Sequence, residues 1–334
     1  MADTLYLLTA EPTLFPSVHE DYLTKIKSGD LNEIKIDEQE KIVTSGEFIN
    51  LHLYTIVTHT KFGITPDSIN LNGKAGEFSA EIKFLDKKVS LNLTFKIPEF
   101  VDYDKKQPIT ITARSFNQNE IFDGFCFEQN NRSVILSCDL FYIVNFATNL
   151  TEKIPLKVEY IGIADKFNED SQKRRNATSR LGEDGHAHLQ TVLAKLQRTP
   201  NRICTICLYK FNENDFNKIM SFPDTIKSIE ATMISYFQPK YNTQRLKFPN
   251  KNNLKNKTSL ESIIQQVGIR NLITFLAVPK HCSMFSEKIS NGNINDEIKL
   301  NICSYFKVSD NFEHAIWVKM EGFSCLSFPF DQFR

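Results

Sequence analysis

The residues of this sequence that could perform chemistry are concentrated in the segment SIEATMISYFQPKYN, residues 228–242. Met233, Ile234 and Phe237 follow Glu230 by three, four and seven positions, so a helix would place all four side chains on one face. An ionised carboxylate among apolar side chains is costly to bury unless a partner compensates its charge. A bound cation is one such partner, so Glu230 is a candidate metal ligand.

Other polar residues accompany this helix at a characteristic spacing. The upstream segment VEYIGIA reads as a strand that carries a tyrosine and a glycine, and SRLGEDGHAHLQTVL places an arginine and a histidine at the opening of a helix. Downstream, the helix of the glutamate is predicted to stop at a Gln-Pro step and to be followed by an asparagine. The set consists of Tyr160, Gly162, Arg180, His186, Glu230 and Asn242.

Over roughly residues 136–245, this spaced set resembles the GIY-YIG nuclease superfamily. The second motif of the family matches Tyr160-Ile161-Gly162, and the first matches Leu140-Phe141-Tyr142, where the family usually has a glycine before the apolar residue. The two motifs would form a strand hairpin with a lengthened loop. The family's helical arginine matches Arg180, its metal-binding glutamate matches Glu230, and its terminal asparagine matches Asn242.

The resemblance implies hydrolysis of a phosphodiester bond. Glu230 would hold one Mg²⁺ or Mn²⁺, with water completing the shell, and Arg180 would grip the non-bridging oxygens with its planar fork. Tyr142 or Tyr160 would deprotonate or orient the attacking water. An ordinary phenol has a pKa of about 10, so a nearby cation would have to lower it.

The remaining matched residues would assist. His186 or His188 would transfer a proton, although two residues that are two positions apart on a helix cannot both point into one site. Asn242 would position the water or the end of the helix. Ordinary structural explanations stand beside these roles: a helix carboxylate paired with a nearby lysine, strand tyrosines packed in a core, and an asparagine in a turn.

The charge distribution favours a polyanionic partner. The formal net charge is zero, but residues 185–212 and 231–260 contain no Asp or Glu while they carry several lysines and arginines. Positive charge therefore gathers around the suspected site, which suits DNA, with RNA as the alternative. A solvated Lys/Asn-rich loop explains the same charges. The candidate nucleic-acid contacts are Lys173, Arg174, Arg175, Lys240, Arg245, Lys247, Lys251 and Lys255.

Composition points to a cytoplasmic globular protein. Of 334 residues, 41% are hydrophobic and 24% charged, and no apolar run reaches the roughly 20 residues of a membrane span. The N-terminus lacks the basic start of a signal peptide, and the seven cysteines are scattered. Cys204 and Cys207 form a CxxC pair, which we interpret as two small hydrophobic residues in a core strand.

The predicted fold class is α+β, in three parts. Residues 1–135 read as a β-rich recognition or sensor domain, with strands at 46–60 and at 77–100, the second range being two strands joined at Asp86-Lys87-Lys88. Residues 136–245 read as a GIY-YIG-like mixed sheet with helices. Residues 246–334 read as a small α+β region in which Thr258 and Glu261 form a capping box for a helix.

The sequence therefore predicts a metal-dependent DNA endonuclease, in the style of a prokaryotic restriction or phage-defence enzyme. The β-rich N-terminal domain would recognise a target, form a homodimer or bind a partner protein. One alternative is a catalytically degenerate relative that binds nucleic acid or a partner protein, with the missing glycine before Tyr142 as its symptom. In another, the N-terminal domain senses a ligand or a protein, and the nuclease is its effector.

Overall fold

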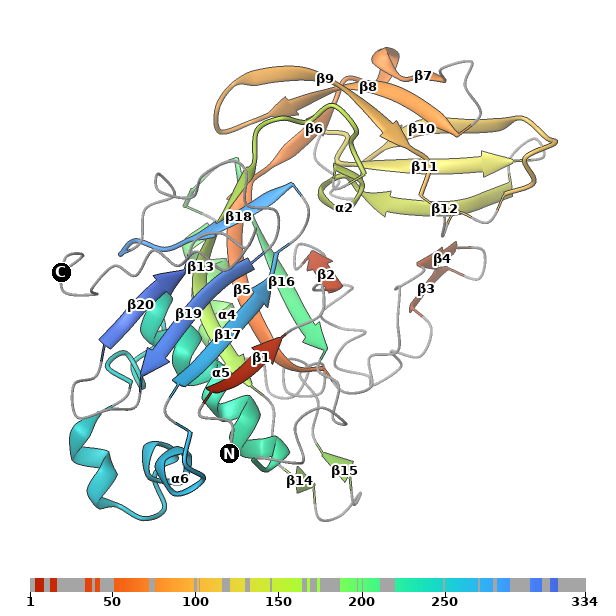
Figure 1. The fold of residues 1–334 in the computed structure, drawn as a ribbon. Helices are drawn as coiled ribbons and strands as arrows, with labels where there is room; N and C mark the ends of the chain where they lie inside the picture. The colour runs from red at the N-terminus through yellow and green to blue at the C-terminus, as the bar shows by residue number, and fades with distance from the viewer. Residues whose placement is uncertain are drawn as a thin grey trace.

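Strands grouped in several sheets make up most of the fold, together with a few helices, which agrees with the mixed α/β content predicted from the sequence (Figure 1). The computed structural model describes residues 4–8, 13–16, 34–37, 40–42, 51–71, 76–98, 101, 103–115, 121–129, 133–144, 146–163, 167–168, 173–174, 187–196, 198–199, 201–210, 220–248, 250–269, 271–278, 281–288, 301–307 and 313–317.

A five-stranded central sheet organises the molecule, and its strand order is β18-β13-β5-β16-β2. β5 pairs antiparallel with both of its neighbours, while β13 pairs with β18 in parallel. The alternating, β-branched sequence LHLYTIVTHT makes β5 a strand that is buried on both faces. The bounds are β2 Thr13–Pro16, β5 Leu51–Thr60, β13 Ile154–Ile163, β16 Arg202–Lys210 and β18 Cys282–Phe285.

A second sheet, which we call the outer sheet, has the order β1-β17-β19-β20. β1 and β17 run parallel, and β17 and β19 run antiparallel. The sheet therefore joins the start of the chain to its last described strands. The bounds are β1 Thr4–Leu8, β17 Asn271–Ala277, β19 Asn301–Lys307 and β20 Glu313–Trp317.

Helix α5, Phe222–Phe237, lies between the two sheets. It contacts β13 and β5 on one side and β17 and β19 on the other, and Thr232 Oγ1 lies 2.9 Å from Thr274 Oγ1 of β17. Most of its residues are buried, because apolar side chains surround the helix. The helix begins after the N-cap Ser221, and it ends at Gln238 in the left-handed region, just before Pro239. The predicted end of this helix is confirmed.

Two further helices flank the sheets. α4, Ala187–Leu196, contacts β16 of the central sheet, and α6, Leu260–Gln266, contacts α5. The predicted capping box of α6 is wrong in its first residue. The N-cap is Ser259, whose hydroxyl accepts from the Ser262 amide at 3.2 Å, and Glu261 instead accepts from the Asn253 side-chain amide at 3.0 Å.

The described parts of residues 61–150 form a β-rich lobe between β5 and β13, drawn at the top of Figure 1, which we call the insert. One of its sheets has the order β6-β8-β7 with β9 paired to β8, and the other has the order β10-β11-β12. The two strands predicted for residues 77–100 are confirmed as β8 and β9. The bounds are β6 Phe62–Ile64, β7 Asn70–Leu71, β8 Glu77–Phe84, β9 Val89–Lys96, β10 Ile109–Arg114, β11 Gly124–Gln129, β12 Ser133–Asp139, α2 Leu140–Val144 and the 3₁₀ turn η1 Pro66–Ser68.

Strand pairing crosses the predicted domain boundaries. β5, from the range assigned to the N-terminal domain, is the middle strand of the sheet that contains β13. β18, from the range assigned to the C-terminal region, is paired at the edge of the same sheet. The described helices include none that is long and apolar enough to cross a bilayer. The short elements not yet named are β3 Ile34–Asp37, β4 Glu40–Ile42, β14 Phe167–Asn168, β15 Lys173–Arg174 and the 3₁₀ helix η3 Lys251–Lys255.

Candidate active site

Two buried tyrosines on neighbouring strands form the centre of the candidate site. The ring centroids of Tyr54 on β5 and Tyr160 on β13 lie 6.1 Å apart, with an interplanar angle of 36°. Gly162 lies beneath them, opposite Tyr54 in the strand register. A Cβ built on Gly162 would lie 2.5 Å from Tyr54 Oη and 2.7 Å from Tyr160 Cε1. This close approach requires glycine, so the second motif is structurally coupled to Tyr54.

A bulge in β13 brings the two tyrosines to the same face. Val158 is opposite Val57 and Tyr160 is opposite Ile56, which leaves Glu159 without a partner residue on β5. One extra residue moves every later side chain to the opposite face of a sheet. Without the bulge, Tyr160 would point away from Tyr54. Bulges of this kind often re-aim side chains beside active sites.

Asn242 fixes the strand that carries Tyr160. Its side-chain Oδ1 accepts from the Ile161 amide at 2.9 Å, and its Nδ2 donates to the Ile161 carbonyl at 2.8 Å. The Tyr241 amide also donates to the Glu159 carbonyl, at 3.2 Å. The chain after α5 therefore runs along the edge of β13 beyond the end of β18. Asn242, a predicted site residue, is thus joined directly to the Tyr-Ile-Gly motif.

Glu230 lies on α5 as predicted, on the least buried stripe of the helix. Its side chain is 13% exposed, and its Oε2 lies 2.8 Å from the NH1 nitrogen of Arg245. The same nitrogen donates to the Lys227 carbonyl at 2.8 Å. A cation does compensate the carboxylate, and here the cation is a guanidinium group. Arg245, predicted to contact nucleic acid, is engaged in this ion pair.

The two tyrosines and α5 lie on opposite faces of the central sheet. Cross-strand partners share a face, so Tyr54, Ile56 and Tyr160 lie on one face, while Leu53 and Ile161 lie on the other. The second face shares a continuous hydrophobic core with α5. A cleft that holds both Tyr160 and Glu230 would therefore have to pass around the edge of β13, where Asn242 lies.

Tyr142 does not occupy the position expected for the first motif. It lies on the short helix α2, which contacts β12, β11 and β6 of the insert, and its ring packs against Phe146 at 5.8 Å. The predicted strand is wrong because Asp139 Oδ1 accepts from the Phe141 amide at 2.8 Å and starts a helical turn. At Tyr160, the strand that pairs with β13 is β5, and β5 carries Tyr54.

Tyr54 is the functional candidate that the motif search missed. The alternating sequence predicted the strand that carries Tyr54, and the only local indication of a functional role was a tyrosine within that strand. The missing information was the pairing of β5 with β13, because the insert separates them in the sequence. Local patterns do not show which distant strands pair.

Several predicted residues have no described contacts. Arg175, Arg180 and His186 lie outside the described residues, while Lys173, Arg174 and His188 are described only in their backbone, on β15 and α4. Of the lysines predicted to contact nucleic acid, three are exposed, namely Lys240, Lys247 and Lys255, and Lys251 lies on η3. Among the described residues, no group of three or more His, Cys, Asp or Glu side chains could hold a metal ion.

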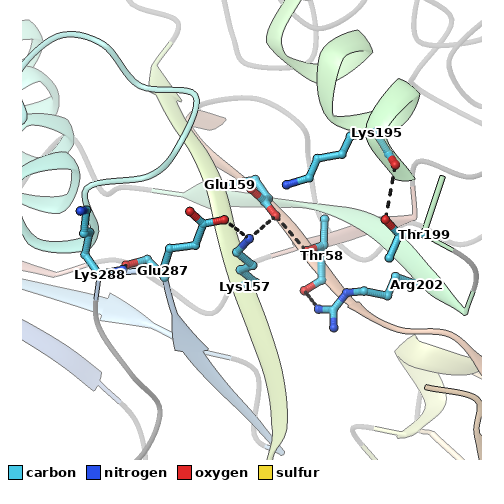
Figure 2. A network of polar contacts seen from close by, with 9 residues as sticks. Thr58, Lys157, Glu159, Lys195, Thr199, Arg202, Glu287 and Lys288 are labelled. Carbon is cyan, nitrogen blue, oxygen red and sulfur yellow. Dashed lines mark hydrogen bonds and ion pairs between the residues drawn. The ribbon is translucent and has the colours of Figure 1, made fainter. Parts of the chain in front are cut away.

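A polar network lies next to Tyr160 on β13 (Figure 2). Glu159 is buried, and its Oε1 lies 3.1 Å from Lys157 Nζ and accepts from Thr58 Oγ1 at 3.3 Å. Its Oε2 has no hydrogen-bond partner in the described part of the chain. Lys157 Nζ also donates to Glu287 at 2.7 Å. Burial opposes the charge of Lys157, but Glu287 and Glu159 outweigh it and raise the pKa of Lys157.

The CxxC pair behaves as the sequence indicated. Cys204 and Cys207 are both buried in β16, and burial raises the pKa of Cys207 to about 12.

No family model, curated protein or solved structure matches the chain. Its function therefore has to be inferred from these residues and their geometry.

Proposed function

We propose that this chain is a metal-dependent endonuclease that hydrolyses phosphodiester bonds in DNA, with a GIY-YIG-like site in which Tyr54 takes the place of the first-motif tyrosine. The observation that carries the proposal is the meeting of Tyr54 and Tyr160 over Gly162. In the resemblance, the first-motif tyrosine belongs to the strand that pairs with the Tyr-Ile-Gly strand. β5 meets that requirement, and α2 does not.

The catalytic roles follow from the chemistry of each group. The phenolate oxygen of Tyr54 or Tyr160 would orient the attacking water and accept its proton, which leaves a neutral phenol. Asn242 holds the backbone of Ile161 and so fixes Tyr160 against rotation of its strand. Arg180 is the candidate for binding the non-bridging oxygens, and His186 the candidate for proton transfer to the leaving oxygen.

Glu230 is the residue that would hold Mg²⁺ or Mn²⁺. When bound, such an ion would stabilise the negative charge that develops around the pentacoordinate phosphorus and would lower the pKa of a bound water. A single carboxylate with water ligands suits Mg²⁺, but Glu230 would have to release Arg245, and it lies on the opposite face of the central sheet from Tyr160. The proposal therefore makes the Glu230–Arg245 pair a resting contact that metal binding replaces.

The ion pair provides a matched test of this role. Plasmid DNA is incubated with wild-type protein, Glu230→Gln or Arg245→Gln, in Mg²⁺, in Mn²⁺ or in EDTA. A metal-holding Glu230 predicts that Glu230→Gln abolishes cleavage, while Arg245→Gln keeps it and lowers the metal concentration required. If both variants lose activity and both are less stable than the wild type, the ion pair is structural, and the assignment of Glu230 as the metal ligand is refuted.

The Glu230–Arg245 pair also favours a second candidate function. A carboxylate already neutralised by a guanidinium group fits a degenerate relative that binds nucleic acid or a partner protein without cleaving it. The two functions differ in one readout. The degenerate protein shifts labelled DNA in a binding assay but leaves it intact in Mg²⁺ and in Mn²⁺. In either case the insert is the candidate module for target recognition or for protein contacts, and RNA is the alternative substrate.

A further inference from the structure

Three lysines from distant parts of the sequence meet beside Tyr160's strand. Lys157 is on β13, Lys195 is on α4, and Lys240 follows α5. Lys195 Nζ and Lys240 Nζ each lie 6.0 Å from the ring centroid of Tyr241, whose amide is bonded to Glu159. Figure 2 shows Lys195 pointing toward the network of Lys157 and Glu159. Convergence from three elements concentrates positive charge at one place on the surface.

An acidic side chain occupies this place in the structure. Glu287 follows β18, its side chain is 53% exposed, and its Oε1 lies 2.7 Å from Lys157 Nζ. The hydrogen bond from Lys157 lowers the pKa of Glu287, and the charges of Lys240 and Lys195 act in the same direction. Glu287 thus lies in a field that favours an anion, and among the described residues its one hydrogen-bond partner is Lys157, so its exposed side chain has a single hydrogen bond to release.

The second carboxylate of the cluster differs from Glu287. The Glu159 side chain is 4% exposed and is held between Lys157 and Thr58, so its charge is a fixed part of the core. Three ammonium groups then face two carboxylates when Glu287 is in place, and only one when Glu287 rotates away. Rotation of Glu287 therefore removes one negative charge from beside the three lysines, which increases their attraction for a phosphate.

We propose that Lys157, Lys195 and Lys240 form a subsite for backbone phosphates of a nucleic-acid strand, which Glu287 occupies as an internal competitor. Tyr241 borders the lysines and offers a partly exposed ring on which a base can stack. Aromatic rings between cationic side chains are the usual platform for single strands. The inference rests on the proposed function for its substrate class, but it concerns binding and not cleavage.

The test measures binding of a short fluorescent single-stranded DNA by anisotropy, in EDTA so that no cleavage occurs. Glu287→Gln is expected to bind the strand about three- to ten-fold more tightly at low salt, because a competing negative charge is lost. The matched control is Glu152→Gln, which removes a similarly exposed carboxylate paired with Lys87 at 3.3 Å in the insert region. This control should bind like the wild type.

Lysine variants supply the opposite change. Lys195→Ala and Lys240→Ala should each weaken binding several-fold and flatten the plot of log affinity against log salt by roughly one unit per lost phosphate contact. Lys87→Ala should leave the slope unchanged. If Glu287→Gln binds no more tightly than Glu152→Gln, the cluster is an ordinary surface ion pair and the subsite is refuted.

Two comparisons keep this inference separate from the proposed function. A mononucleotide measured in the same way should gain nothing from Glu287→Gln, and an equal gain would point to a pocket for a single free phosphate and overturn the strand assignment. Tighter strand binding by Glu287→Gln without cleavage in any metal would support the subsite and refute the nuclease. Cleavage by the wild type without tighter binding by Glu287→Gln would do the reverse.

Discussion

Aromatic side chains pack between strands in both the insert and the central sheet, but with different consequences. In the insert, Phe78 contacts Phe95 at 5.0 Å and Phe125 at 5.2 Å, and these rings contribute only apolar contact to the core. In the central sheet, Tyr54 and Tyr160 place phenol groups against a glycine. These insert rings therefore serve packing alone, whereas the paired rings of the central sheet also bring phenol groups into close, buried contact.

The ion pairs of the two regions show the same contrast. Lys87 and Glu152 lie on the surface with side chains 44% and 73% exposed, where a pair contributes little to stability. Lys157 and Glu159 are 18% and 4% exposed, and one oxygen of Glu159 is left without a partner among the described residues. A buried carboxylate oxygen without a partner is costly. Such costs tend to be retained where they serve function, which is the case we propose for the central sheet.

The largest difference between the two regions in the loss of stability on substitution is expected at two asparagines. Asn242 clamps both backbone groups of Ile161 in the central sheet and is buried, while Asn149 accepts from the Thr94 amide at 2.8 Å and donates to the Asn92 carbonyl at 3.0 Å on an exposed edge of the insert. Asn242→Ala should lower the free energy of unfolding by about 2–4 kcal/mol, because two buried backbone groups lose their partners.

Asn149→Ala is the control for that change. Water can replace the lost bonds at an exposed site, so the free energy of unfolding should fall by less than about 1 kcal/mol. Urea unfolding followed by circular dichroism measures both variants. Equal losses would show that the Asn242 clamp is no more important than a surface contact, and Tyr160 would then lack its support.

A smaller difference is expected at two strand glycines. A methyl group on Gly162 would meet both tyrosine rings, whereas one on Gly63 of β6 would meet the Ile121 methyl Cγ2 at 3.2 Å, which can move. Gly162→Ala should therefore lower the free energy of unfolding by about 1–3 kcal/mol, and Gly63→Ala by less than about 1 kcal/mol. Thermal unfolding of the two variants gives the comparison. A tolerated Gly162→Ala would mean that the rings are not held against β13.

The last contrast concerns the dependence of stability on pH, where the two regions respond in opposite directions. Burial lowers the pKa of His59 on β5 to about 3, so unfolding takes up a proton below pH 6.5 and stability falls as the pH falls. Burial and Asp123 raise the pKa of Asp139 in the insert to about 7. Its folded state holds a proton that the unfolded state releases above about pH 4, so stability falls as the pH rises toward 7.

Asp139→Asn separates the two groups. The amide oxygen can still accept from the Phe141 amide, but it carries no charge to bury. The variant should be more stable than the wild type at pH 8 and equal to it near pH 4, as measured by urea unfolding across the range. A variant that is less stable at pH 8 would show that the Asp139 carboxylate is favoured in the folded state.

Local patterns in the sequence predicted the elements better than their pairing. The alternation in residues 51–60 and the apolar period of α5, ended before Pro239, are signals carried by the segments themselves. The apolar run Leu140–Val144 is too short for the spacing of its side chains to distinguish a helix from a strand. The carboxylate of Asp139, which accepts from the Phe141 amide, favours the helix. Short apolar runs need such capping information.

The site was only partly predictable for the same reason. Tyr160, Glu230 and Asn242 were found because each belongs to a local motif. The role proposed for Tyr54 depends on a strand pairing across the insert, which no local motif indicates. The ion pair of Glu230 was not predicted because Arg245 reaches it through a turn after α5. Contacts of this kind depend on tertiary structure, which a single sequence does not show.

The central claim is that Tyr54, and not Tyr142, is the partner of Tyr160. Tyr54→Phe and Tyr142→Phe each remove one hydroxyl group and keep the ring, so plasmid cleavage in Mg²⁺ by the two folded variants compares the tyrosines directly. Tyr54→Phe should slow cleavage by on the order of 100-fold or more, the usual contribution of a proton-transfer group, while Tyr142→Phe stays near the wild-type rate. Full activity of Tyr54→Phe together with loss of activity in Tyr142→Phe would contradict this account.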